Sequence, residues 1–151
     1  GRISIIFIYC KLGSRTRFPS YLARQIQRYF VPAHIVWSMK LALAQFEIEG
    51  GKPSVNRQRA RDLVREAAES GCDLVALPEI FNVGYFAFDS YSREAEPLDG
   101  ETITELQEMA ADLDISICAG SIVEDLAEST ARGFDTPEAD GYANTDRKSV
   151  V

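Results

Sequence analysis

The pattern of hydrophobic positions predicts three strands in the middle of the chain. Dense apolar runs occupy residues 40–46, 73–77 and 115–123, and each is bounded by turn-forming or polar residues. Runs this short and this apolar are typical of strands inside an α/β sheet, and we expect the first run to be buried on both faces. Pro78 ends the second strand, because proline lacks the N–H that a sheet requires.

Helical spacing occupies the segments between these strands. Ser54 is suited to cap a helix whose apolar positions lie three and four residues apart, and Gly71 is suited to end it in a left-handed conformation. Residues 102–113 repeat the spacing. The resulting β-α-β-α-β order predicts an α/β fold with a parallel sheet. We expect an aromatic loop at residues 82–91 and a mobile surface loop at residues 126–141.

The composition is that of one ordinary globular domain. The 151 residues are 46% hydrophobic and 26% charged, which fits a single core and excludes disordered and collagen-like chains. The longest apolar stretch is much shorter than the roughly 20 residues of a membrane span, so we expect no membrane association. Three cysteines without a C-x-x-C spacing predict neither disulfides nor a zinc site, and we expect a cytoplasmic protein without metal or cofactor.

The charge of the chain changes sharply at Met39. Residues 1–38 hold six basic and no acidic residues, whereas residues 39–145 hold eight basic and 22 acidic residues. An Arg-rich, acid-free start is typical of a targeting peptide, but the break at a methionine favours translation extended upstream of the true start. We therefore expect residues 1–38 to be a leader outside the fold. The acidic body argues against nucleic-acid binding, which requires a basic face.

The last six residues also differ from the body of the chain. Residues 146–151, DRKSVV, match the translation of a common sequencing adaptor. Our hypothesis is that they form a foreign tail, and that residues 39–145 are the native segment, cut from a longer protein.

Glu79 is the strongest candidate for chemistry. It follows the apolar run 73–77 and Pro78, at the carboxyl end of a predicted strand, which is where parallel α/β sheets build their sites. A carboxylate in this place needs a partner or a use, because burying an unpaired charge costs free energy. The residues alone leave two interpretations open: a functional acid, or a glutamate that caps a helix or forms a salt bridge.

Aromatic residues and a second carboxylate accompany Glu79. Tyr85, Phe86 and Phe88 either wall a substrate pocket or pack their loop onto the sheet. Glu124, at the end of the third strand, is either a supporting carboxylate or a solvated strand end.

Several motifs occur in a characteristic order. The run LPEIFNVGY at residues 77–85 is preceded by AQ at 44–45 and GCDLV at 71–75, and is followed by GSIVE at 120–124 and NT at 144–145. In this order the sequence resembles the nitrilase, or carbon–nitrogen hydrolase, superfamily.

The resemblance covers nearly all of residues 39–145 and implies a fold and a mechanism. It implies a four-layer αββα sandwich, of which this chain holds the N-terminal part. It also implies hydrolysis of amides, N-carbamoyl compounds or nitriles through a Glu, Lys and Cys triad and a thioester, by a homo-oligomer without metal or cofactor. Glu79 corresponds to the general base, and Tyr85 and Phe86 are the expected substrate contacts.

The lysine and cysteine of the triad have no counterpart in this sequence. In the family the lysine follows the strand that residues 144–145 open, and the cysteine lies further on. Lys148 comes too soon for that role, and Cys72 and Cys118 lie beside or within predicted strands, where packing is the expected role. We therefore expect the chain to be inactive by itself. The alternative is a non-catalytic domain or pseudo-enzyme of the same fold.

Overall fold

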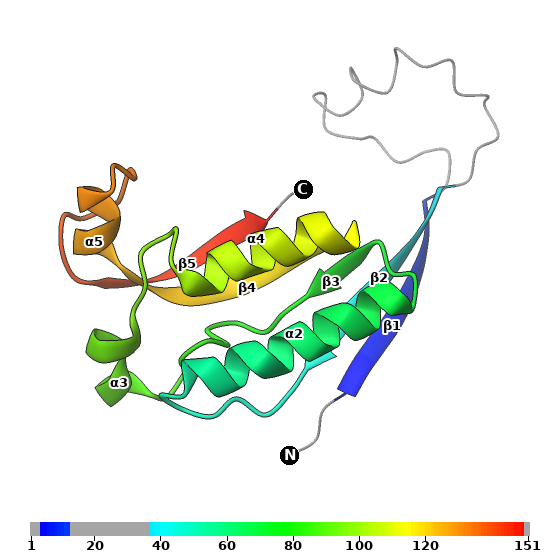
Figure 1. The fold of residues 1–151 in the computed structure, drawn as a ribbon, viewed down its shortest axis with the longest axis horizontal. Helices are drawn as coiled ribbons and strands as arrows, with labels where there is room; N and C mark the ends of the chain where they lie inside the picture. Colours follow the sequence, from blue (N-terminus) through cyan, green and yellow to red (C-terminus); the bar gives the residue numbers. More distant parts are fainter. Residues whose placement is uncertain (1–3, 13–36, 150–151) are drawn as a thin grey trace, which may run out of the picture.

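A five-stranded mixed sheet forms the centre of the fold (Figure 1). The computed structural model describes residues 4–12 and 37–149 of the chain, and the side chains of residues 38–146. The strands, in their order across the sheet, are β1 (Ser4–Leu12), β2 (Trp37–Gln45), β3 (Leu74–Ala76), β4 (Ser116–Asp125) and β5 (Tyr142–Ser149). The central pairs β2–β3 and β3–β4 are parallel, whereas β1 and β5 run antiparallel to their neighbours.

Two long helices, α2 (Pro53–Glu69) and α4 (Glu101–Leu113), lie along one face of this sheet (Figure 1). Helix α2 lies between β2 and β3 in the sequence, and helix α4 lies between β3 and β4. The predicted β-α-β-α-β order and the α/β fold class are therefore confirmed. The core forms where the helices meet the strands. Its largest fully buried side chains include Val64, Val75, Phe81, Ile115, Ile117 and Ile122.

The ends of the helices agree only in part with the sequence prediction. Helix α2 begins at Pro53 without a side-chain cap, so the prediction that Ser54 caps it was wrong. Proline suits the first helical position, because its fixed φ is helical and its missing N–H needs no partner there. Gly71 follows the helix with a φ of +71°, which confirms the predicted left-handed residue. Helix α4 is followed by Asp114, also left-handed, with a φ of 51°.

Strand β2 is buried on one face rather than on two. Ala42 and Ala44 lie in the core at 0% and 4% exposure, whereas Leu43, on the opposite face, is 37% exposed. The prediction of two-sided burial was therefore wrong for the described chain. Apolar composition does not say which layer covers a strand, and in the described residues α2 and α4 lie on the face of Ala42.

Short helices occupy parts of the two predicted loops. Helix α3 (Phe88–Glu94) lies in the aromatic segment and buries none of its side chains. Helix α5 (Leu126–Ala131) directly follows β4, and its N-cap Asp125 accepts a hydrogen bond from the Glu128 N–H at 3.0 Å. Neither segment is loop throughout. Among the described residues, no helix is both long and apolar enough to cross a membrane.

The edge strands fall in segments that we expected to be foreign to the domain. Strand β1 pairs with β2 from Ser4 beside Gln45 to Leu12 beside Trp37, so at this strand the structure differs from the expectation that residues 1–38 lie outside the fold. Strand β5 likewise continues past residue 145 and ends at Ser149. Pairing of this kind uses backbone groups, so the origin of both segments stays a prediction.

Candidate active site

The turn that carries Glu79 is fixed against strand β4. On one side of the glutamate, the Leu77 N–H donates to the Cys118 carbonyl at 2.9 Å. On the other side, the Ile80 N–H donates to Oγ of the buried Ser121 at 3.0 Å. The backbone around Glu79 is therefore held by a neighbouring strand at two points, and the carboxylate projects from a defined position at the carboxyl end of β3.

Gly120 allows this close approach. Its φ is +66°, and a Cβ at this position would lie 2.2 Å from the Pro78 carbonyl oxygen. The pairing of β4 with β5 also shifts register between Cys118 and Ser121, a bulge of the kind that often accompanies active sites. Ile80 has a φ of 46°, which is unusual for a β-branched residue. Strain of this kind persists where the surroundings fix the backbone, and it is concentrated at functional sites.

The Glu79 carboxylate is exposed and is oriented by a residue far along the chain. Asn144, on β5, donates from Nδ2 to Oε1 of Glu79 at 2.6 Å. Within the described residues the second oxygen, Oε2, has no hydrogen-bond partner, and the carboxylate neither caps a helix nor forms a salt bridge. Within the described residues, Glu79 therefore has neither of the structural roles that the sequence left open, the helix cap and the salt bridge. One carboxylate oxygen is held by an amide, and the other is available for proton transfer.

Glu124 lies on the same strand pair but in a different environment. It is 2% exposed, so it is not a solvated strand end. Its Oε2 accepts a hydrogen bond from the Thr145 hydroxyl, while Oε1 has no hydrogen-bond partner among the described residues. Asn144 and Thr145 are adjacent on β5, so one dipeptide contacts both carboxylates.

The aromatic residues beyond Glu79 project outward. Tyr85 and Phe86 are 51% and 85% exposed, and their rings meet edge to face at 5.1 Å. The Tyr91 hydroxyl donates to the Tyr85 carbonyl at 2.7 Å and so ties the loop to α3. Packing onto the sheet, the structural alternative for these rings, is therefore not seen for Phe86. Their contact with substrate stays a prediction.

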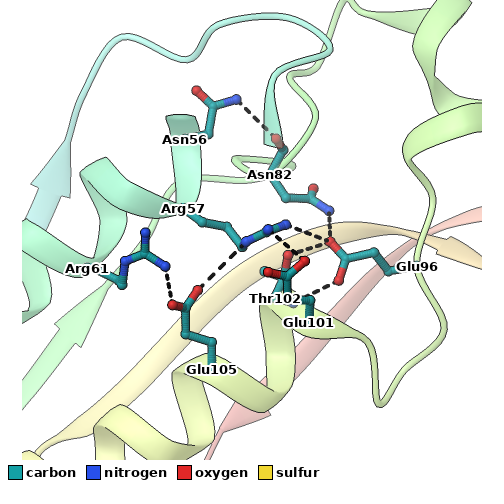
Figure 2. A network of polar contacts seen from close by, with 8 residues as sticks. All are labelled: Asn56, Arg57, Arg61, Asn82, Glu96, Glu101, Thr102 and Glu105. Carbon is teal, nitrogen blue, oxygen red and sulfur yellow. Dashed lines mark hydrogen bonds and ion pairs between the residues drawn. The ribbon is translucent and has the colours of Figure 1, made fainter. Parts of the chain in front are cut away.

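A buried asparagine holds the loop that follows Glu79. Asn56, at 0% exposure, accepts from the Glu49 N–H at 2.8 Å and donates to the carbonyls of Glu49 and Asn82, at 2.8 and 3.0 Å. Figure 2 shows Asn56 and Asn82 side by side above a network of charged residues. Three backbone groups from two loops are thus bonded to one side chain.

The network below these asparagines joins helices α2 and α4. Arg57 contacts Glu101 at 2.7 Å and Glu96 at 3.8 Å, and the Thr102 N–H donates to Glu96 at 2.7 Å (Figure 2). Asn82 completes it by donating to Glu96 at 3.3 Å. The network therefore connects the start of α4 with the loop that carries the candidate site.

A cavity of 720 Å³ beside this network does not include Glu79. Its lining contains Arg57, Arg93 and Arg132, and these cations are paired with Glu101 at 2.7 Å, Glu94 at 2.7 Å and Asp99 at 3.2 Å, respectively. A cavity of this volume is large enough to hold a small molecule. The chemistry favours Glu79, because the cavity's arginines already have carboxylate partners and it contains no nucleophile with a base beside it.

The environment of Cys72 makes its thiol a poor nucleophile. Cys72 is buried, and this burial is the main cause that raises the pKa of its thiol; the neighbouring Asp73 carboxylate raises it further, against a lowering by Lys40. A raised pKa keeps the thiol protonated at neutral pH. Cys118 is half-buried within β4. The expected packing role fits Cys72, which belongs to the buried core, whereas for Cys118 it stays a prediction.

Glu79 lies at the end of a strand, as its position after Pro78 predicted, but its contact with Asn144 was not predicted. Asn144 and Thr145 appeared only as part of a motif, and Asn56 did not appear at all. The pairing of β5 with β4, which places Val123 beside Asn144, is what creates the contact. Asn56 gave no usable signal, because a buried polar residue within an amphipathic helix resembles any other polar position until its neighbours are known.

Comparison with known proteins identifies the family. The model of the carbon-nitrogen hydrolase family matches residues 40–139. The chain therefore belongs to the carbon–nitrogen hydrolase family, as its motifs predicted.

Individual relatives agree with this assignment. Omega-amidase NIT2 of Homo sapiens is 42% identical over 92 residues, which are 60% of this chain and 32% of that protein. A nitrilase of Pyrococcus abyssi is 34% identical over 91 residues, which are 58% of this chain and 34% of that protein. The solved structure of NitN amidase from Neterenkonia sp. AN1 superposes with a TM-score of 0.50 at 25% identity, over 56% of this chain and 33% of that one. The chain spans about a third of the length of the curated relatives it matches.

Proposed function

We propose that this chain is part of a hydrolase of non-peptide carbon–nitrogen bonds in which Glu79 is the general base. The observation that carries the proposal is an exposed carboxylate, at the carboxyl end of a parallel strand, with one oxygen held by Asn144 and the other unpartnered among the described residues. Membership of the carbon–nitrogen hydrolase family supports it. The names omega-amidase and nitrilase, borne by relatives, support an amide or a nitrile as substrate, and we keep an N-carbamoyl compound as a third proposed substrate.

The proposed reaction has two halves, and Glu79 accepts one proton in each of them. In the first, Glu79 takes the proton of a cysteine thiol, and the thiolate attacks the carbon of an amide. The carbon–nitrogen bond breaks as the leaving amine takes this proton from Glu79, and a thioester remains. In the second half, Glu79 takes a proton from water, which attacks the thioester carbon. The carbon–sulfur bond then breaks, the acid is released, and Glu79 returns the proton to the cysteine sulfur. We propose that Tyr85 and Phe86, which are exposed in the loop after Glu79, contact the substrate.

The lysine and cysteine of this mechanism are assigned to a part of the protein outside this chain. The chain spans about a third of the length of its relatives, and within the described residues no lysine is paired with Glu79. We infer that the 151-residue chain alone does not turn over substrate. Assembly into a homo-oligomer and location in the cytoplasm stay predictions.

The test is Glu79→Gln in the full-length enzyme. The substitution keeps the shape of the side chain but removes the proton acceptor, so kcat should fall on the order of a hundredfold or more while the melting temperature changes little. Glu108→Gln, at an exposed position of α4, is the matched control and should leave kcat unchanged. Full activity in a folded Glu79→Gln protein would remove Glu79 from the mechanism. A folded wild-type protein without turnover on amides, N-carbamoyl compounds and nitriles would favour the pseudo-enzyme.

A further inference from the structure

Strand β5 contacts two carboxylates on opposite faces of the sheet. Successive side chains of a strand point to opposite faces, so Asn144 and Thr145 diverge. Asn144 is paired with Val123, which packs with Ile80 on the Glu79 side. Thr145 is paired with Ile122, which belongs to the core under the helices. The hydrogen bond from Thr145 to Glu124 is therefore formed on the helix side, behind the candidate active site.

Glu124 is a fixed point on that side. Glu124 is 2% exposed, and the backbone on both sides of it is bonded to the backbone of Glu96. The Glu96 N–H donates to the Val123 carbonyl at 3.1 Å, and the Asp125 N–H donates to the Glu96 carbonyl at 2.9 Å. Among the described residues its Oε1 has no partner. Burying a carboxylate with a single hydroxyl donor costs free energy that an apolar side chain would not cost. Stability alone therefore does not account for a glutamate at this position.

Strand β5 needs such a fixed point. It is an edge strand whose one neighbour in the described sheet is β4, and the pairing of the two strands is interrupted between Cys118 and Ser121. Asn144 and Glu79 are both exposed, so packing does not fix the amide in place. The residue that follows Asn144 in the sequence is Thr145, and its hydroxyl is hydrogen-bonded to Glu124.

On the basis of the proposed role of Glu79, we propose that Glu124 is a positioning residue of the active site. It holds the Thr145 hydroxyl, Thr145 fixes the register and twist of β5 at this point, and Asn144 is thereby kept against the Glu79 carboxylate. Glu124 touches neither substrate nor the reacting atoms. Its effect passes through Thr145 and Asn144 to the orientation of the base.

The experiment measures kcat and KM separately in the full-length enzyme. Thr145→Val removes the donor to Glu124. A displaced Asn144 then leaves the Glu79 carboxylate misoriented, so kcat should fall on the order of tenfold while KM changes little. Thr145→Ser, which keeps the hydroxyl, should restore kcat. The matched control is Thr130→Val, which removes a hydroxyl bonded to Thr136 at 2.6 Å on the exposed side of α5 and should leave kcat and KM unchanged.

A double-mutant cycle shows whether the effect passes through Asn144. Asn144→Ala, at an exposed position, should lower kcat by itself. Adding Thr145→Val to it should lower kcat no further, because residues that act through one contact are not additive. If the valine variant does not fold, Thr145→Ala removes the same hydroxyl without placing a methyl group against Glu124.

Three outcomes would overturn the inference while leaving the proposed function intact. The first is a Thr145→Val enzyme with a lower melting temperature but an unchanged kcat per folded molecule. The second is a double variant in which the two losses of activation free energy add. The third is an Asn144→Ala enzyme with an unchanged kcat. Failure of the proposed function has a different signature, namely full turnover by the Glu79→Gln enzyme.

Discussion

Gly120 and Pro78 are in contact so close that a Cβ on the glycine would lie 2.2 Å from the proline carbonyl oxygen. This contact joins the turn of Glu79 to strand β4 at the point where the pairing with β5 shifts register. Backbone atoms form both sides of the contact, so neither side can yield by a change of rotamer.

Gly120→Ala is therefore expected to destabilise the protein and to displace Glu79. The φ of +66° alone costs an alanine about 1 kcal/mol, and the clash with Pro78 adds to that cost. Denaturant unfolding and kcat/KM measure the two effects. Gly133→Ala is the matched control, because its φ is +88° and nothing lies within 4 Å of its Cβ position. Equal losses of stability in the two variants would show that the contact with Pro78 is unimportant.

Asn56→Leu is expected to loosen the loops on both sides of the site. It removes the partner of the buried Asn82 carbonyl and of the half-buried Glu49 N–H, whereas the Glu49 carbonyl keeps the Lys52 N–H at 3.2 Å. An unsatisfied buried group costs about 1–3 kcal/mol, so the free energy of unfolding should fall by about 2 kcal/mol or more. Urea unfolding measures the loss. Gln58→Leu, on the exposed face of the same helix, should change stability by less than about 0.5 kcal/mol. Similar values for both variants would contradict the role of Asn56.

Phe86→Ala should raise KM with little change in melting temperature. The ring is 85% exposed, so its removal leaves no cavity in the core, and any loss reflects lost contact with substrate. Steady-state kinetics on the full-length enzyme separates KM from kcat. Phe86→Tyr keeps the ring and should behave like the wild type. An unchanged KM in the alanine variant would exclude Phe86 as a substrate contact.

Cys72 should resist alkylation in the folded protein. Its thiol has a raised pKa, chiefly because of burial, so the fraction of thiolate at pH 8 is smaller than for an ordinary cysteine. Since the fold favours the neutral thiol, this group contributes stability below the pKa of the unfolded thiol, and the contribution is lost as the pH rises through the higher folded value. Labelling rates with iodoacetamide, with Cys72→Ala to assign the signal, test this. Labelling of native Cys72 as fast as in the unfolded chain would contradict it.

Local sequence patterns predicted the helices and strands whose formation depends on interactions within one segment. The spacing of Leu63, Val64 and Ala67 placed α2 correctly, because an amphipathic face must be buried wherever the helix lies. Helix α5 was missed although Asp125 and Glu128 stand at the positions of an N-cap and its third residue, a signal that was available. Helix α3 buries none of its side chains, so no apolar periodicity marked it.

The candidate site was predictable only where it depends on a single segment. Glu79 was found because Pro78 and a strand end make a carboxylate conspicuous. Its contact with Asn144, and the bond of Thr145 to Glu124, depend on how β5 pairs with β4. A strand register is set by the whole sheet, and a shift by one residue would exchange the two side chains between the two faces.

The contact between Glu79 and Asn144 spans 65 positions of sequence, and this separation has a consequence for synthesis. A ribosome delivers the strand of Glu79 well before β5, and contacts distant in sequence form late, because a long loop must close first. A nascent chain can therefore complete its two helices and three parallel strands while the carboxylate is still unoriented. In the proposed enzyme, the base would become competent only after the last strand of this segment had docked, so hydrolytic capacity would appear as a late event in the maturation of the chain.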